Sequence, residues 1–247
     1  MTITINLGEI TVDVTQKKIK NVHLSVHPPS GRVRISAPAR MSLDTIRAFA
    51  ISKLDWIRKQ QKKVREQERE TQREYIDRES HQVWGKRCLL KVEELDAAPS
   101  VVLMHDTLLI RVRPGAGVIK KKAVVDLWYR DQVRENMPVL IDKWEPVMGV
   151  KVSNFYIRQM KTLWGSCNPR AESIRLNSEL AKKPRECLEY VVVHEMVHLS
   201  ERTHGPLFVA AMDQFMPLWR NHKDALNKLP VKHENWVFSS SLIDGPL

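Results

Sequence analysis

The segment HEMVH holds the residues whose types and spacing are most typical of catalysis. It places His194 and His198 four residues apart. On a helix this spacing stacks the two imidazoles one turn apart on one face, where they can hold a single zinc ion. Glu195 lies between them in the sequence, and its carboxylate is suited to take a proton from a water molecule at the metal's open position. The motif therefore predicts a zinc-dependent hydrolase with Glu195 as its base.

A catalytic zinc normally takes a third protein ligand, and several downstream residues could supply it. We expect His204, because Gly205 and Pro206 mark a turn that would bring its ring back to the ion after the helix ends. Glu201 could approach only if the helix continued straight. The remaining candidates are His222, His233 and Glu234. We expect one ion per chain, zinc or another divalent transition metal.

The helix that must position this motif is predicted to begin at Pro184 and to run to about Ser200. Proline is tolerated in the first turn of a helix, where its missing N–H would have no partner in any case. A separate apolar stripe on the same helix is formed by Leu188, Val192, Met196 and Leu199. The helix can therefore face the core without using its histidines.

The first part of the chain is predicted to be rich in strands. Apolar and polar residues alternate over residues 1–40, which is typical of a small strand meander. From Ser42 the apolar spacing becomes helical, and the charged stretch 58–79 is typical of a solvated helix extension or a linker. Strands are predicted again over residues 82–113, followed by a helical stretch over 119–144.

The second part of the chain is predicted to contain a small sheet beside the helix with the motif. Strands are expected at residues 152–160 and 173–177, joined by an irregular loop that contains WGSC, and another helix is expected from about Leu207. We therefore predict an α+β fold. Residues 1–80 would form the strand meander with its charged helix, and residues 81–247 a zincin-like domain.

Composition adds broader expectations. Forty Lys and Arg against twenty-nine Asp and Glu give a formal charge of +11, which would attract phosphate-rich partners, nucleic acid among them. The three cysteines are widely spaced and contain no CxxC pair, so neither a disulfide framework nor a thiolate zinc site is indicated. No stretch has the length of a membrane-spanning helix, and the first residues do not look like a secretory leader. We expect a cytoplasmic protein without membrane contact.

The block from Met160 to Phe208 resembles the YgjP-like family of metallohydrolases, which are relatives of SprT-like zinc peptidases. The resemblance depends on WGSC, on RLN, on YVVVHE and on a histidine four positions before Phe208. It implies that the zinc ligands are His194, His198 and His204 and that Glu195 is the catalyst. The segments KKIKNVHLSVHPPSGRVRISAP and WIRKQ are also similar, so the resemblance covers most of the chain and is looser in its centre.

One position departs from a related pattern. The ligand spacing equals that of metzincins, in which a glycine makes a left-handed turn before the third ligand, but here that position is Glu201. A non-glycine residue adopts such a turn only at a cost, so we expect the chain to turn later, near Thr203 to Gly205.

Three residues before the helix are candidates for substrate binding. Arg175 could bind a phosphate or a carboxylate, and it belongs with Asn177 to the RLN strand. Trp164 opens the WGSC segment, where a loop or core anchor is the more ordinary role for a tryptophan. We expect no catalytic role for Cys167, because no sequence partner marks it as a nucleophile.

Three functions remain open at this point. A metallopeptidase is favoured by the motif and by the resemblance to SprT-like enzymes. Some YgjP-like proteins are assigned UTP pyrophosphatase activity, so the resemblance also implies a nucleotide substrate as an alternative. The third hypothesis is a non-enzymatic, nucleic-acid-associated protein with a structural metal, which predicts that Glu195→Gln would leave function intact.

Overall fold

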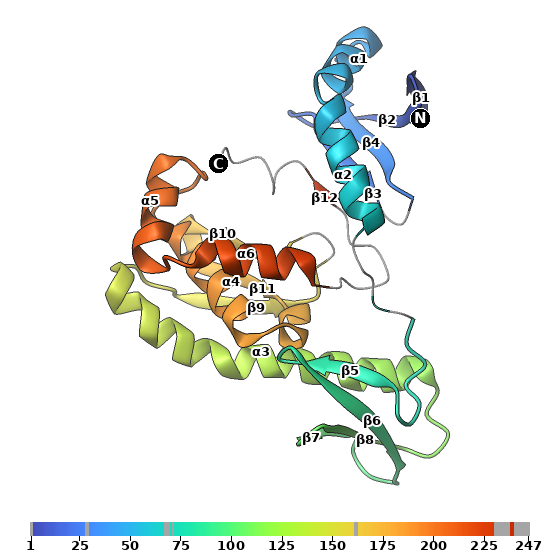
Figure 1. Ribbon diagram of the computed structural model, residues 1–247, viewed down its shortest axis with the longest axis vertical. Coiled ribbons are helices and arrows are strands. Elements are labelled where there is room, and N and C mark those ends of the chain that lie inside the picture. The colour runs from blue at the N-terminus through green and yellow to red at the C-terminus, as the bar shows by residue number, and fades with distance from the viewer. Residues whose placement is uncertain are drawn as a thin grey trace. The chain divides into compact units, whose positions relative to one another are not determined.

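The computed structural model describes residues 2–27, 30–66, 70, 72–160, 163–229 and 238–239. It confirms the α+β class (Figure 1). The chain forms two compact units, Met1–Glu70 with Pro230–Leu247 and Thr71–Leu229. The expected domains 1–80 and 81–247 stay a prediction, and Tyr75 lies in the core of the second unit. Across the described chain, no helix is both long and apolar enough to span a bilayer. The cytoplasmic location stays a prediction.

The first unit contains a five-stranded sheet with the order β1-β2-β4-β3-β12. Its strands are β1 (Thr2–Leu7), β2 (Ile10–Lys17), β3 (His23–His27), β4 (Arg32–Pro38) and β12 (Phe238–Ser239). The strand-rich prediction is confirmed, but the strands do not form a simple meander, because β4 inserts between β2 and β3 and runs parallel to β2. Alternation reports which face of a strand is buried and does not report which strand lies next to it.

Two helices follow this sheet. They are α1 (Leu43–Ser52) and α2 (Leu54–Glu66). Ser42 caps α1 by accepting a hydrogen bond from the Thr45 backbone N–H at 3.2 Å. The charged stretch is helical only at its beginning, since residues 72–79 contain no helix. The sequence has no apolar residue between Val64 and Tyr75, so nothing in that interval can anchor a longer helix against a core.

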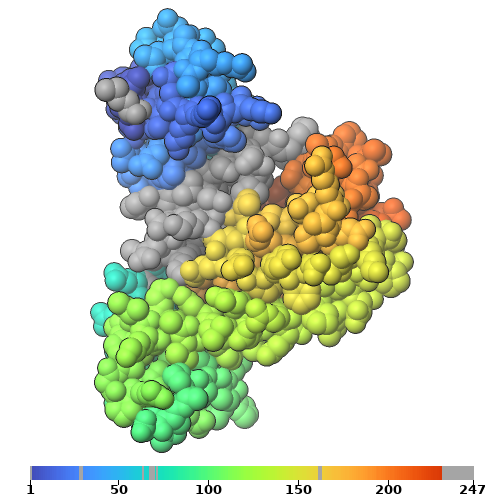
Figure 2. Space-filling model, turned by 180° about the vertical axis from the view of Figure 1, so that it is seen from behind, coloured from blue at the N-terminus to red at the C-terminus, as the bar shows by residue number. Residues whose placement is uncertain are grey.

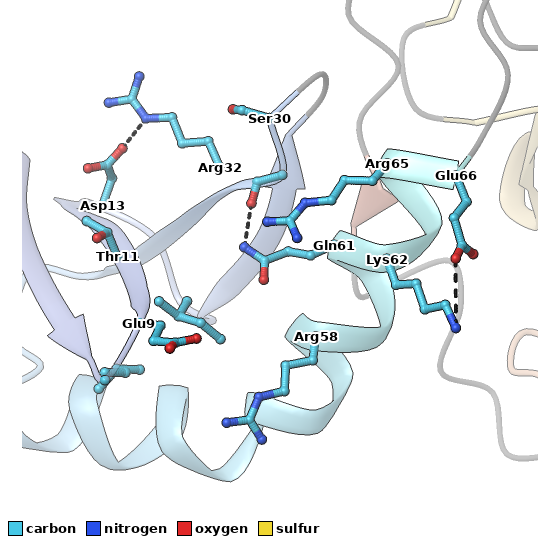
Figure 3. Close-up of a pocket in the computed structure, with 14 residues that line it drawn as sticks. Glu9, Thr11, Asp13, Ser30, Arg32, Arg58, Gln61, Lys62, Arg65 and Glu66 are labelled. Atoms are coloured by element: carbon cyan, nitrogen blue, oxygen red, sulfur yellow. Dashed lines mark hydrogen bonds and ion pairs between the residues drawn. The ribbon is translucent and has the colours of Figure 1, made fainter.

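A groove of about 940 Å³ lies between α2 and the sheet of the first unit (Figure 3). Arg58 and Arg65 extend to the same side of α2, whereas Lys62 turns to Glu66, with 3.8 Å between Nζ and Oε1. Gln61 reaches from α2 between Arg58 and Arg65, and its side-chain amide donates to the Gly31 carbonyl at 2.9 Å. The helix and the turn before β4 are therefore joined by a direct bond.

The second unit contains a four-stranded sheet and a long helix. The strands, in the order β5-β6-β8-β7, are β5 (Ser80–Val83), β6 (Lys86–Glu94), β7 (Ser100–Met104) and β8 (Thr107–Val112), and the helix is α3 (Val118–Met148). Its core-facing stripe is Val125, Tyr129, Val133, Met137 and Ile141, each one turn after the last. Figure 2 shows the surfaces of this sheet and of α3 adjoining each other. The helix ends at Gly149, where φ is 64°.

A three-stranded sheet packs against the helix with the motif and contacts α3 through its strand β9. It consists of β9 (Asn154–Arg158), β10 (Gly165–Asn168) and β11 (Ser173–Asn177), in the order β10-β11-β9. β9 and β11 are parallel, and β10 forms an antiparallel hairpin with β11. The prediction of an irregular loop at WGSC is therefore wrong. Residues 165–168 are an edge strand, and its four-residue length is too short for alternation to reveal.

Three helices complete the second unit: α4 (Arg185–Val197), α5 (Pro206–Phe215) and α6 (Trp219–Lys228). α4 begins directly after Pro184, as expected, and contacts α3, α5, α6, β10 and β11. The predicted stripe residues Leu188, Val192 and Met196 are buried. Because α4 is surrounded on most sides, its polar side chains are held in a packed interior.

Candidate metal centre

The three predicted histidines converge at the C-terminal end of α4. His194 lies in the last turn of this helix, His198 is its C-cap residue, and His204 lies just before α5. The Nε2 atom of His204 is 3.1 Å from Nε2 of His194 and 3.1 Å from Nε2 of His198. Among the described residues, this is the group of His, Cys, Asp and Glu side chains arranged to hold a metal ion.

These distances fit a shared divalent ion. Zinc binds imidazole nitrogens at about 2.0–2.1 Å in tetrahedral geometry, which places two ligand nitrogens roughly 3.3 Å apart. Nδ1 of His198 donates to the Glu201 carbonyl at 2.8 Å, so its Nε2 presents a lone pair to the other two rings. The Nε2 atoms of His194 and His204 lie close to the separation that a shared ion requires. The donor set therefore fits a divalent transition metal.

The chain from His198 to His204 reaches the site without a left-handed residue. No residue from 198 to 206 has a positive φ, and Gly205 has a φ of −75°. The expectation that the metzincin turn is not used is confirmed. Glu201 contributes its carbonyl to His198 in place of a turn.

The other candidate ligands do not join this cluster where the structure describes them. His222 lies on α6 and is not part of the histidine group, and neither is the Glu201 carboxylate. His233 and Glu234 lie outside the described residues. Within the described chain, His204 is therefore the third imidazole of the cluster, and its role as a metal ligand stays a prediction.

The surroundings of the cluster keep all three rings neutral. Burial lowers the pKa of His194 well below its usual value, and the neighbouring histidines and the charge of Lys223 lower it further. The pKa of His198 and that of His204 are also lowered, mainly by burial. Phe208 packs against all three rings, with centroid distances of 4.6–4.9 Å. Neutral imidazole is the form that binds metal, so the fold keeps the three histidines in the protonation state that a metal ion requires.

Glu195 is the buried carboxyl group of this site. Its side chain is 5% exposed, and burial raises its pKa to about 8. Burial, together with the charge of this carboxyl group, raises the pKa of the Cys167 thiol to about 12. Cys167 is therefore a protonated thiol at neutral pH, which agrees with the expectation that it is not a nucleophile. A buried carboxyl of raised pKa beside a ligand cluster is typical of a catalytic acid or base.

The candidate substrate residues lie in different places. Arg175 pairs with Ser166 in register, on the face of the sheet opposite to Gly165 and Cys167, and so points away from Glu195. Trp164 is half-buried, packs on the core, and has the Lys183 ammonium 5.8 Å from its ring centre. Their roles in substrate binding stay predictions, and the geometry of Arg175 gives that role no support.

Asn177 is fully buried, and its amide is used within the protein. Its nitrogen donates to the carbonyls of Met160 at 3.0 Å and Leu163 at 2.8 Å. Its oxygen accepts from the backbone N–H of Met160 at 3.3 Å and of Glu179 at 3.2 Å. All four hydrogen-bonding positions are occupied, so Asn177 holds the connection between β9 and β10 and has none left for a substrate.

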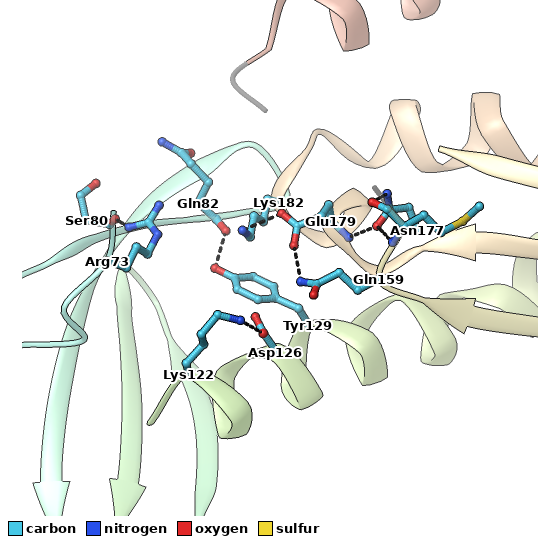
Figure 4. Close-up of polar contacts among 11 residues, drawn as sticks. Arg73, Ser80, Gln82, Lys122, Asp126, Tyr129, Gln159, Asn177, Glu179 and Lys182 are labelled. Atoms are coloured by element: carbon cyan, nitrogen blue, oxygen red, sulfur yellow. Dashed lines mark hydrogen bonds and ion pairs between the residues drawn. The ribbon is translucent and has the colours of Figure 1, made fainter. Parts of the chain in front are cut away.

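A buried ion pair lies beside the same connection (Figure 4). In the 3-10 helix Ser178–Lys182, Glu179 lies 2.7 Å from the Lys182 ammonium and accepts a hydrogen bond from Gln159 at 3.2 Å. Lys182 lies over the ring of Tyr129 on α3, with 5.3 Å to its centre. These contacts tie the strand that carries Asn177 to the long helix.

Sequence reasoning missed three residues that shape this site. Phe208 enters the sequence patterns only as the end of a motif, yet it forms the wall behind the imidazoles. Lys223 on α6 lies close enough to lower the pKa of His194 and that of His204. Gly165 lies under the Glu195 carboxyl. None follows from local spacing, although the position of Phe208 one turn after His204 is a usable signal.

Comparison with known proteins supports the resemblance seen in the sequence. A family model described as YgjP-like, metallopeptidase domain, matches residues 20–229, which include the three histidines and Glu195. A crystal structure of the metallopeptidase zymogen of Pyrococcus abyssi abylysin is similar to part of this chain, with 18% identity and a TM-score of 0.34. That likeness covers 38% of this chain and 98% of the other. No curated protein matches.

Proposed function

Because this chain belongs to the YgjP-like metallopeptidase family, we propose that it is a zinc-dependent hydrolase of peptide bonds. Family membership implies a divalent metal and hydrolysis. The observation that supports the finer proposal is the convergence of three neutral imidazoles, with the buried carboxyl group of Glu195 on the residue after His194 in α4. Three protein ligands leave one corner of a tetrahedral ion open, as catalytic zinc sites require.

Each residue of the site has a distinct task in this mechanism. His194, His198 and His204 would hold the ion through Nε2, and the Glu201 carbonyl fixes the orientation of His198. When bound, the ion supplies a Lewis acid that acidifies water, polarises a carbonyl and favours the ionised form of Glu195. Glu195 takes a proton from the attacking water and returns it to the leaving amine. The surrounding apolar residues exclude bulk water and so strengthen these interactions.

Comparison of two proteins tests the proposal. Wild type and Glu195→Gln, each loaded with one equivalent of zinc, are incubated with an unstructured protein, and the products are identified by mass spectrometry. We expect peptide fragments from wild type and a roughly 10²–10⁴-fold lower rate from the variant, because glutamine cannot accept the proton. Equal rates would contradict the mechanism and favour the structural-metal hypothesis.

The same samples address the nucleotide alternative, which stays a prediction. UTP is offered in place of the protein, and release of the monophosphate and pyrophosphate is measured. Glu195-dependent hydrolysis of UTP without any peptide cleavage would replace the peptidase proposal.

We further propose that the first unit binds the phosphates of nucleic acid. The first 70 residues carry fourteen Lys and Arg against seven Asp and Glu, whereas the 159 residues from 71 to 229 carry twenty-five against twenty, so the positive charge is denser in the first segment. The groove beside α2 presents Arg58 and Arg65 on one side, and Arg65 has no ion pair within the described chain. Asp13, across the groove, is neutralised by Arg32 at 2.5 Å.

Fluorescence anisotropy with a short single-stranded DNA tests this proposal. The double variant Arg58→Glu and Arg65→Glu should bind the DNA more weakly. The slope of the logarithm of its binding constant against the logarithm of the salt concentration should be smaller by about 0.7 for each phosphate that the protein no longer neutralises. Arg47→Glu is the control for charge outside the groove, since Arg47 is exposed on α1. Equal binding by wild type and the double variant would refute the proposal.

A further inference from the structure

Gly165 has no backbone reason to be glycine. It is the first residue of β10, and its φ is not positive. A glycine inside a strand is required either by such a conformation or by the close approach of another group. Only close approach remains for Gly165.

The approaching group is the side chain of Glu195. A Cβ atom built on Gly165 would lie 2.4 Å from Oε1 of Glu195, 2.7 Å from Cγ and 2.8 Å from Cδ. Ordinary contact begins at 3.4 Å, so even a methyl group would displace the carboxyl by about 1 Å. The Glu195 side chain therefore occupies the space that a side chain at position 165 would need.

Neither partner has room to retreat. β10 pairs with β11 along its whole length, with Gly165 opposite Leu176, and the Trp164 carbonyl accepts from the Asn177 backbone N–H at 2.9 Å. Glu195 is nearly fully buried on α4, which lies beside β10 and β11 (Figure 1). A displaced carboxyl would have to find another rotamer inside a packed core.

We propose that Gly165 is a positioning residue: the bare backbone of β10 holds the Glu195 carboxyl in its place beside the three imidazoles. The inference rests on the proposed function, in which Glu195 is the base. A base must lie within hydrogen-bond reach of its proton, and an error of about 1 Å can lower a rate roughly 100-fold. The glycine thus sets where the proton is accepted without touching the substrate.

Kinetics of Gly165→Ala give the first test. We expect kcat to fall about 100-fold, while KM and the dissociation constant for zinc stay at their wild-type values, because the histidines are not displaced. Gly117→Ala is the matched control. Gly117 precedes α3, has a φ of −71° and has no atom within 4 Å of an added Cβ. Its kcat should equal that of wild type.

A melting cycle tests the contact without any activity measurement. The four zinc-free proteins are wild type, Gly165→Ala, Glu195→Ala and the double variant. Removing the Glu195 side chain vacates the space that the new methyl group needs. The alanine at position 165 should therefore lower Tm in the wild-type background and lower it less, or not at all, beside Glu195→Ala. If Gly165→Ala fails to fold alone, folding of the double variant carries the same information.

The outcomes separate this inference from the proposed function. Wild-type kcat in Gly165→Ala, with Glu195→Gln inactive, overturns the positioning role and leaves the proposed function standing. Equal Tm decreases in both backgrounds, or failure of both Gly165→Ala proteins to fold, overturn the contact. Full activity of Glu195→Gln overturns the proposed function, and the positioning role with it.

Discussion

Replacement of Asn177 by alanine should destabilise the second unit and leave substrate affinity unchanged. The Asn177 side chain is fully buried and makes four hydrogen bonds, three of them to Met160 and Leu163 and one to Glu179. The substitution leaves two carbonyls and two backbone N–H groups without these partners. The connection between β9 and β10 would then lack the side chain that closes it.

The magnitude follows from these bonds. Each hydrogen bond of Asn177 contributes about 1 kcal/mol net to the free energy of unfolding. Met160 and Leu163 are half-buried, so water can replace some of the hydrogen bonds that their backbone groups lose. The free energy of unfolding should therefore fall by about 2–4 kcal/mol. For a domain of this size, 1 kcal/mol lowers Tm by roughly 2–4 °C, which predicts a fall of roughly 5–15 °C.

The assay compares three variants by thermal melting and by steady-state kinetics on the zinc-loaded enzyme. Asn177→Asp should also be destabilised, because a carboxylate cannot donate to the two carbonyls and would be buried beside them. Asn154→Ala, an exposed asparagine on β9, is the control and should melt like wild type. A wild-type Tm for Asn177→Ala together with a raised KM would refute this reasoning and restore Asn177 as a substrate residue.

Four further predictions concern the metal site and its surroundings. Zinc at about 100 times its dissociation constant should raise the free energy of unfolding by ~2.7 kcal/mol. His204→Ala should weaken zinc binding by more than the roughly 10–100-fold that is typical of an outer-shell change. Competition with a chromogenic chelator measures the zinc affinity, and an unaltered affinity would remove His204 from the ligand set. In metal-free Glu195→Gln, the free energy of unfolding should fall as pH drops below 6.5. Burial lowers the pKa of His194, His198 and His204 in the fold, so the unfolded chain binds protons first; a flat denaturant profile from about pH 8 to 5 would contradict this. The Glu195→Gln background is needed because Glu195, with its pKa raised to about 8, opposes this trend: its folded form holds a proton that the unfolded chain has released. Iodoacetamide at about pH 8 should leave Cys167 unmodified in the native protein and modify it in urea, since its pKa is raised to about 12; rapid native labelling by mass spectrometry would show otherwise.

The part of the site that follows from helix geometry could be predicted from the sequence. His194 and His198 lie four residues apart, and α4 stacks residues at that spacing whatever surrounds the helix. The start of α4 after Pro184 follows from backbone chemistry in the same way. The position of His204 could also be anticipated, because a break in the chain six residues after His198 leaves few paths other than back toward the helix.

Tertiary structure alone decided the contacts between segments distant in the chain. The strand at Gly165 is defined by its pairing with β11, the four bonds of Asn177 by the path of the preceding connection, and the wall at Phe208 by the packing of α5 on α4. Local periodicity carries no information about which strands are neighbours or which atoms meet across a core, because these depend on how the whole chain packs. The sequence by itself therefore determined the candidate ligands and their expected chemistry, and only packing determined which groups surround Glu195.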